Sequence, residues 1–135
     1  MSTKLMAETL RMKRWAVVGA SDDPGRYGYR IFRVLRDAGH QVFPIHPTLA
    51  EIDGVKCHAR LSDLPEVPEV VDMVVNPRVG LKVFEEIRSL GIRYVWMQPG
   101  TRSDEIRAFA KQHGIELIED CVLVRIGREV HGDDD

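Results

Sequence analysis

Trp15-Ala16-Val17-Val18-Gly19 is the stretch that decides the fold of this 135-residue chain. A short apolar run that ends at a glycine is typical of a strand buried on both faces. After the loop from Ala20 to Gly25, apolar residues recur at the spacing of one buried helix face; these are Ile31, Val34, Leu35 and Ala38. Gly39 follows where a helix commonly ends in the left-handed conformation. The segment therefore predicts a buried strand followed by an amphipathic helix.

The same rhythm continues through the rest of the chain. Apolar runs predict four further strands, over residues 41–45, 70–75, 92–97 and 115–118, and a short last strand at 122–126. Asn76-Pro77 and Ser103 are typical helix starts, and Gly91 and Gly114 are typical helix ends. Alternating strands and helices predict a Rossmann-like three-layer α/β fold, with a five-stranded parallel sheet and helices on both faces.

The length is that of one domain, and we expect residues 1–135 to form a single unit. Its core spans about residues 13–126, preceded by a leading helix within 1–12 and followed by an acidic tail over 127–135. Leu5, Met6, Thr9 and Leu10 share one side of the leading helix. Ile52-Asp53-Gly54 predicts a turn, and a short segment follows at 61–64.

Composition and charge exclude several classes of protein. A formal net charge of −2 argues against a nucleic-acid binder that neutralises phosphates. The spaced arginines Arg26, Arg30, Arg33 and Arg36 are most simply a solvated helix face. The five histidines show no metal spacing, and the apolar runs are too short to span a membrane. Two distant cysteines and the absence of a leader sequence favour a cytoplasmic protein.

The first strand-to-helix loop is the expected ligand site. Open parallel sheets bind ligands beyond the carboxyl ends of their strands. Gly19 permits a tight turn, Ser21 offers a hydroxyl, and the amides of the following helix point at the loop with partial positive charge. The loop matches neither the dinucleotide-binding nor the Walker motif, so it predicts phosphate binding without naming the ligand.

The second strand ends without a carboxylate. NAD-binding domains usually carry an Asp or Glu there to hold the ribose hydroxyls, whereas this chain has Ile45-His46-Pro47. Arg26, Arg30 and His46 make the adjoining edge neutral or positive, which suits a ribose that carries an extra phosphate. The end of the second strand therefore argues against an NAD site.

Several segments together resemble the stand-alone CoA-binding domain family, which is related to the N-terminal domain of the succinyl-CoA synthetase alpha subunit. Val17 to Ser21 with Pro24-Gly25-Arg26 resembles the opening of that family. The similarity covers about residues 13–126 through these further segments: Leu35 to Val42, Pro44 to Pro47, Leu61 to Pro65, Val71 to Val74, Val95 to Gly100 and Glu119 to Cys121.

The resemblance implies that coenzyme A (CoA) lies across the carboxyl edge of the sheet. Because the second strand ends without a carboxylate, we expect CoA to bind in preference to NAD. The CoA phosphates would lie by the first loop, its adenosine near Pro47, and its pantetheine past Asn76-Pro77 toward Gln98. The expected cofactor-binding residues are Gly19, Ala20, Ser21, Arg26, Tyr27, Arg30, His46, Pro47, Asn76, Pro77, Gln98 and Gly100. Two positions depart from the family: Thr48 stands where a lysine is common, and Asn76-Pro77-Arg78 where relatives show an aromatic residue and an arginine.

No catalytic constellation accompanies this site. Cys121 follows two acids and has no histidine near it in sequence, so we expect a buried structural thiol. The sequence favours a non-catalytic protein that binds CoA or an acyl-CoA. Two alternatives stay open: an NADP-dependent, reductase-type nucleotide-binding domain, and an interaction module with a vestigial pocket. A homodimer through the leading helix or a sheet edge, or an unidentified protein partner, is also left open.

Overall fold

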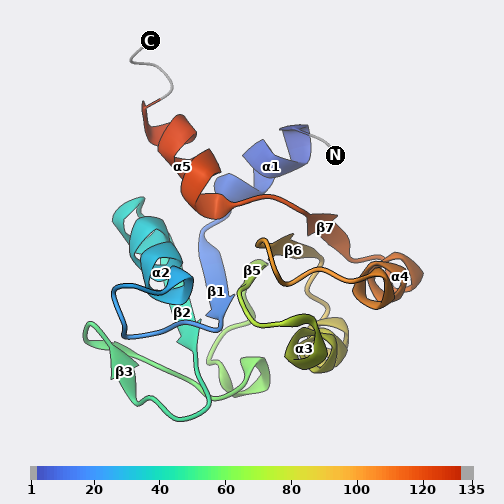
Figure 1. Cartoon of the computed structure of the whole chain (residues 1–135), viewed down its shortest axis with the longest axis horizontal. Helices are drawn as coiled ribbons and strands as arrows, with labels where there is room; N and C mark the ends of the chain where they lie inside the picture. The colour runs from blue at the N-terminus through green and yellow to red at the C-terminus, as the bar shows by residue number, and fades with distance from the viewer. Residues whose placement is uncertain (1–2, 132–135) are drawn as a thin grey trace.

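The computed structural model describes residues 3–131, and five parallel strands form its central sheet. The strands are β1 (Arg14–Val18), β2 (Gln41–Ile45), β5 (Val70–Met73), β6 (Tyr94–Met97) and β7 (Glu116–Ile118). They lie in the order β2-β1-β5-β6-β7, and every neighbouring pair is parallel. The predicted five-stranded parallel sheet is confirmed, and the chain reverses its direction of progress between β1 and β5 (Figure 1).

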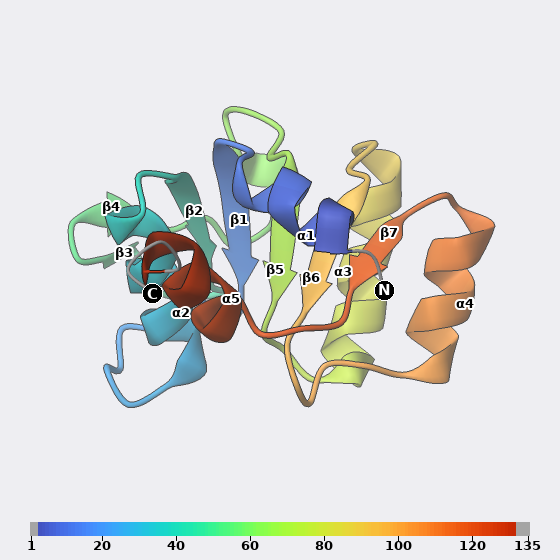
Figure 2. The ribbon, with the colours of Figure 1, turned by 90° about the horizontal axis from the view of Figure 1, so that it is seen from above.

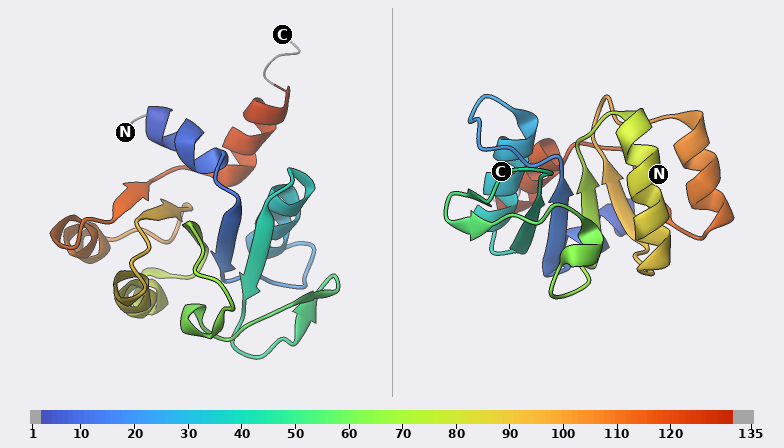
Figure 3. Two further views of the ribbon diagram at one scale, coloured as in Figure 1. Left: turned by 180° about the vertical axis from the view of Figure 1, so that it is seen from behind. Right: turned by 90° about the horizontal axis from the view of Figure 1, so that it is seen from below.

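Helices cover both faces of the sheet. One face packs against α1 (Thr3–Leu10), α2 (Tyr27–Asp37) and α5 (Val122–His131), which lie in front of the strands in Figure 2. The other face packs against α3 (Pro77–Ser89) and α4 (Asp104–Gln112), seen from below in Figure 3. Each face has its own apolar layer, because successive side chains of a strand point to opposite sides. The predicted three-layer arrangement is therefore present.

A small hairpin follows β2. It consists of β3 (Glu51–Ile52) and β4 (Val55–Lys56), joined by Asp53 and Gly54, which both have positive φ. That backbone belongs to a tight hairpin turn, as the Asp-Gly pair predicts. The Asp53 carboxylate accepts hydrogen bonds from Tyr29 and Arg33, which fixes the hairpin to α2. A short 3₁₀ helix, η1 (Leu61–Asp63), completes the connection to β5.

The predicted last strand at 122–126 is wrong, because this segment begins α5. Val122 and Ile126 are buried and four residues apart, whereas Val124 between them is 48% exposed. Burial at that spacing is the pattern of a helix face, although the β-branched residues alone suggest a strand. The tail predicted over 127–135 is corrected as well, since α5 continues to His131; Asp133, Asp134 and Asp135 lie outside the described residues.

The leading helix attaches to the sheet through a buried polar contact. Leu5, Met6 and Leu10 belong to the apolar layer on that face. Thr9 is fully buried, and its hydroxyl accepts a hydrogen bond of 2.9 Å from the Trp96 indole nitrogen. The predicted contact side of this helix is therefore confirmed. No helix of residues 3–131 is both long enough and apolar enough to cross a membrane.

Candidate functional site

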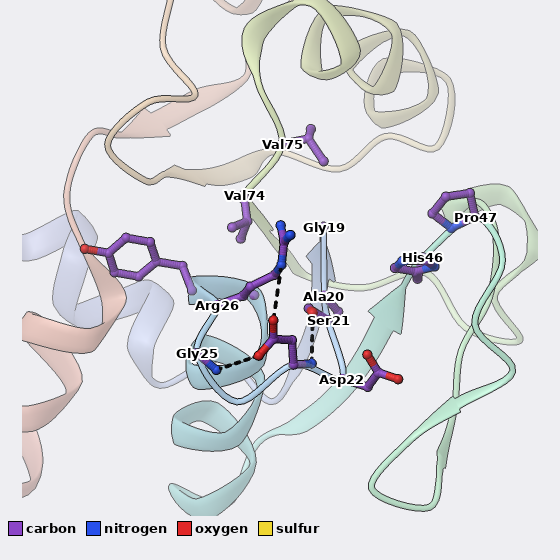
Figure 4. Close-up of a pocket in the computed structure, with 13 residues that line it drawn as sticks. Gly19, Ala20, Ser21, Asp22, Gly25, Arg26, His46, Pro47, Val74 and Val75 are labelled. Carbon is purple, nitrogen blue, oxygen red and sulfur yellow. Dashed lines mark hydrogen bonds and ion pairs between the residues drawn. The ribbon is translucent and has the colours of Figure 1, made fainter.

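A pocket of about 800 Å³ opens at the carboxyl edge of the sheet, where β1 and β5 end side by side. This volume lies within the range of small-molecule and cofactor sites. The pocket also lies at the topological switch point of the sheet, where open α/β folds bind ligands. Its walls come from the β1–α2 loop, the segment after β2 and the segment after β5: Gly19, Ala20, Ser21, Asp22, Asp23, Gly25, Arg26, Tyr27, Gly28, His46, Pro47, Val74 and Val75 (Figure 4).

Gly19 has a backbone conformation that its position requires. Its φ is +99°, and a Cβ added there would lie 3.0 Å from a methyl carbon of Val75. Gly28 must also be a glycine, because a Cβ at this position would collide with the carbonyl oxygen of Gly19. Two glycines thus let the first turn of α2 approach the end of β1 closely. The amides of that turn are brought to the pocket wall.

Hydrogen bonds within the β1–α2 loop hold its shape. The Ser21 hydroxyl accepts a bond of 3.0 Å from the Asp23 amide, and the Asp23 carboxylate accepts one of 2.9 Å from the Gly25 amide. The other carboxylate oxygen of Asp23 lies 3.6 Å from Nε of Arg26 (Figure 4). Arg26 is the N-cap of α2, and within residues 3–131 no side-chain hydrogen bond caps that first turn. An anion there would meet free amides and the positive end of the helix dipole.

His46 forms the far wall of the pocket in a defined orientation. Its Nδ1 accepts hydrogen bonds from the backbone amides of Thr48 and Leu49, at 3.1 and 3.0 Å. An Nδ1 that accepts carries no proton, so the neutral ring has its proton on Nε2. His46 therefore offers a ligand one N–H donor.

The structure groups part of the predicted site around this pocket. The residues that line it as expected are Gly19, Ala20, Ser21, Arg26, Tyr27, His46 and Pro47. Arg30 is not among the lining residues; its guanidinium lies 5.6 Å from the centre of the Tyr27 ring, which is 60% exposed. Asn76 caps α3 by accepting a hydrogen bond from the Val79 amide, and Pro77 is the first residue of that helix.

Gln98 and Gly100 lie at the same sheet edge but do not line the pocket. Gly100, with φ of +90°, turns the chain after β6. Gln98 is only 3% exposed, and its amide nitrogen donates a 2.7 Å hydrogen bond to the buried carboxylate of Asp72. Burial raises the pKa of Asp72 to about 8, although the bond from Gln98 acts in the opposite direction. The Gln98 side chain therefore engages the core in this structure.

Sequence reasoning missed several residues of the pocket. The apolar run predicts a strand that includes Val74 and Val75, but β5 ends at Met73 and both residues line the pocket. Gly28 lies within the first turn of a helix, where a glycine carries little signal on its own. The acidic pair Asp22 and Asp23 belongs to the predicted loop, yet no ligand role was assigned to it.

Other candidate chemistry is sparse in the described chain. Residues 3–131 contain no group of three or more metal-ligating side chains. Cys57 is buried. Burial is the main cause that raises the pKa of its thiol, and the charges of Asp22 and Glu51 raise it further. The sequence predicts a buried thiol at Cys121, but this side chain is only half-buried. Trp96 and Met97 are core residues.

Comparison with known proteins agrees with this geometry. The CoA binding domain family matches residues 13–127, nearly the whole chain. The chain belongs to the CoA-binding domain family. An uncharacterised protein of Bacillus subtilis, YneT, is 31% identical over 115 residues, which is 84% of this chain and 85% of the relative.

Relatives of this CoA-binding domain include both small proteins and parts of larger enzymes. A hypothetical protein from Pyrococcus horikoshii has a TM-score of 0.89 at 29% identity, over 96% of this chain and 92% of that chain. An ADP-forming acetate–CoA ligase of Methanocaldococcus jannaschii is 30% identical over 114 residues, which is 78% of this chain but only 16% of the ligase. The chain therefore matches one portion of that enzyme.

Proposed function

We propose that this protein is a non-catalytic binding protein for CoA or an acyl-CoA, with the ligand phosphates at the β1–α2 loop. The observation that carries the proposal is the pocket at the β1/β5 switch point, where Gly19 in the loop and Gly28 in α2 bring the free amides of α2 to the pocket wall. Membership of the CoA-binding domain family supports the ligand class. The two free cysteines support a cytoplasmic setting.

Three groups would meet the diphosphate. The first-turn amides of α2 would donate to its oxygens, and the Ser21 hydroxyl lies on the same wall. Arg26 is 74% exposed at its side chain and pairs with Asp23, so it can exchange that exposed ion pair for a ligand phosphate. Exposed ion pairs are worth little, and an arginine–phosphate hydrogen bond is the stronger interaction.

A binding role without catalysis fits the residues around the pocket. Its ionisable side chains are Asp22, Asp23, Arg26, Tyr27 and His46, and three of these, Asp23, Arg26 and His46, already have defined structural partners. The Nδ1 of His46 is committed to the backbone, and the neighbouring Ser21 hydroxyl accepts from the backbone, so no activated nucleophile is formed by the lining residues. The two remaining candidate functions, a reductase-type domain and an interaction module, make different predictions about the bound ligand.

Mass spectrometry of the ligand that copurifies with the protein separates these functions. The protein is purified quickly at low salt, denatured, and the supernatant is scanned for CoA, acyl-CoA and nicotinamide nucleotides. We expect CoA or an acyl-CoA close to one equivalent per chain. Recovery of NADP would favour the reductase-type domain. A ligand-free protein that also fails to take up added CoA would favour the interaction module.

A further inference from the structure

Asp22 is the one acidic side chain of the pocket wall whose charge the protein leaves uncompensated. Its neighbour Asp23 accepts from the Gly25 amide and pairs with Arg26. Within residues 3–131, neither a hydrogen bond nor an ion pair engages the carboxylate of Asp22. The side chain is exposed, so an unpaired carboxylate costs little here, but any ligand in the pocket meets a full negative charge.

Asp22 lies at the end of the pocket where the adenosine of a nucleotide would lie. Figure 4 shows it on the side of His46 and Pro47, away from the Gly25 end of the loop. The charge of Asp22 also helps to raise the pKa of Cys57, whose neighbour His58 pairs with Ile45 at the end of β2. In Rossmann-like sites the ribose lies at the end of the second strand, next to the phosphates.

The end of β2 itself supplies no carboxylate, because it carries His46 and Pro47. Asp22 brings one to the same region from the neighbouring loop. A carboxylate accepts hydrogen bonds from ribose hydroxyls, and the Nε2 proton of His46 can be donated to a hydroxyl oxygen. Thr48, which follows Pro47, carries no charge to balance a phosphate. The local chemistry suits free ribose hydroxyls and disfavours an added phosphate.

We propose that Asp22 determines the ribose selectivity of the pocket, so that it binds an ADP-type ligand with free ribose hydroxyls in preference to the same ligand with a 3′-phosphate. This inference rests on the proposed CoA-type function and specifies the ligand further. Dephospho-CoA and CoA differ only in that phosphate, so dephospho-CoA should bind more tightly. The sequence-based expectation was the reverse, because it placed Arg26 and Arg30 at this edge without the charge of Asp22.

The magnitude follows from the repulsion between two like charges at a protein surface. Charges a few ångströms apart at a partly solvated surface repel by on the order of 1 kcal/mol or more. This corresponds to roughly a fivefold or larger difference in dissociation constant. Because the pair is open to solvent, the difference should shrink at high salt.

Calorimetric titration of dephospho-CoA and CoA into wild type, Asp22→Asn and Glu85→Gln tests the inference. Glu85 is an exposed acid on α3 outside this pocket, so its substitution changes the net charge equally. Wild type and Glu85→Gln should prefer dephospho-CoA by about fivefold or more. Asp22→Asn should lose most of that preference, chiefly by binding CoA more tightly.

The failure of this inference can be distinguished from the failure of the proposed function. If wild type binds both CoA compounds and prefers CoA, or if Asp22→Asn leaves the ratio unchanged, Asp22 does not set ribose selectivity and the proposed function stands. If neither compound binds to folded wild type, the proposed function is refuted together with the inference. Circular dichroism confirms that each variant is folded.

Discussion

Replacement of Asp72 by asparagine should make the protein more stable at neutral and alkaline pH. Asp72 lies in the centre of the sheet, on β5, and is completely buried. One of its oxygens accepts from Gln98, while the other oxygen and Gln98 Oε1 have no partner within the described residues. An asparagine keeps an oxygen that can accept from Gln98 and replaces the unpaired carboxylate oxygen with an amide group that can donate to Gln98 Oε1. It also cannot ionise.

The pH dependence follows from the two pKa values of the Asp72 carboxyl. Burial raises the folded-state pKa from 3.8 to about 8, so the unfolded chain ionises at lower pH than the folded one. Stability is therefore greatest below the unfolded-state pKa and falls as pH rises toward the folded-state value. The slope is about 1.4 kcal/mol per pH unit, and the loss by pH 7 reaches about 4 kcal/mol.

The assay is urea unfolding of wild type and Asp72→Asn, followed by circular dichroism at several pH values between about 4 and 8. The difference in free energy of unfolding between the two proteins should be small at the acidic end and grow as pH rises. Comparing the two proteins cancels the contributions of all other ionisable groups. A difference that stays flat, or that grows toward acidic pH, would refute the reasoning.

Glu119→Gln provides a control of opposite sign. Hydrogen bonds from Arg107, at 2.7 and 2.8 Å, hold the pKa of Glu119 below its usual range. A carboxylate with a lowered pKa stabilises the protein above its unfolded-state pKa, and this contribution is lost as pH falls. Glu119→Gln should therefore be less stable than wild type at neutral pH and close to it under acidic conditions.

Two further substitutions test the close packing described above. Gly28→Ala places a methyl group against the Gly19 carbonyl oxygen and should destabilise the protein by about 3 kcal/mol. The control is Gly80→Ala, whose Cβ would meet only ordinary contacts from 3.6 Å and which should be neutral or stabilising. Equal effects of the two substitutions in urea unfolding would contradict this. Thr9→Val leaves the buried Trp96 indole N–H without its acceptor and should cost about 1–3 kcal/mol. In a double-mutant cycle, Thr9→Val should cost less free energy of unfolding in the Trp96→Phe background than in wild type. Strict additivity of the two substitutions would show that the bond contributes nothing.

The sequence predicts much of the fold, because the elements are encoded locally. Buried parallel strands require continuous apolar runs, and these define β1, β2, β5, β6 and β7 to within a few residues. Strand order is a tertiary property, and alternation alone does not specify that β1 lies between β2 and β5. The error at α5 has a similar origin, since Val122 and Ile126 are helical because they pack on the layer around α2.

The candidate site is predictable to the level of the loop but not of each side chain. Gly19 and Ser21 were found because a strand-to-helix loop at the sheet edge is specified by the order of elements. Whether a side chain there turns to the pocket or to the core depends on its neighbours. Gln98 turns inward because Asp72, distant in sequence, offers it an acceptor. Asp22 shares the pocket wall with His46 and Pro47, which are distant from it in sequence.

The most direct test of the central claim is a calorimetric titration of CoA into wild type, Val75→Phe and Val79→Phe. Val75 lines the pocket beside Gly19, so a phenylalanine there should occupy ligand space, whereas Val79 is 43% exposed on α3 and does not line it. We expect saturable one-to-one binding by wild type and Val79→Phe. A folded Val75→Phe should bind at least tenfold more weakly, which corresponds to about 1.4 kcal/mol. Absence of CoA binding by folded wild type, or equal affinity in all three proteins, would contradict it.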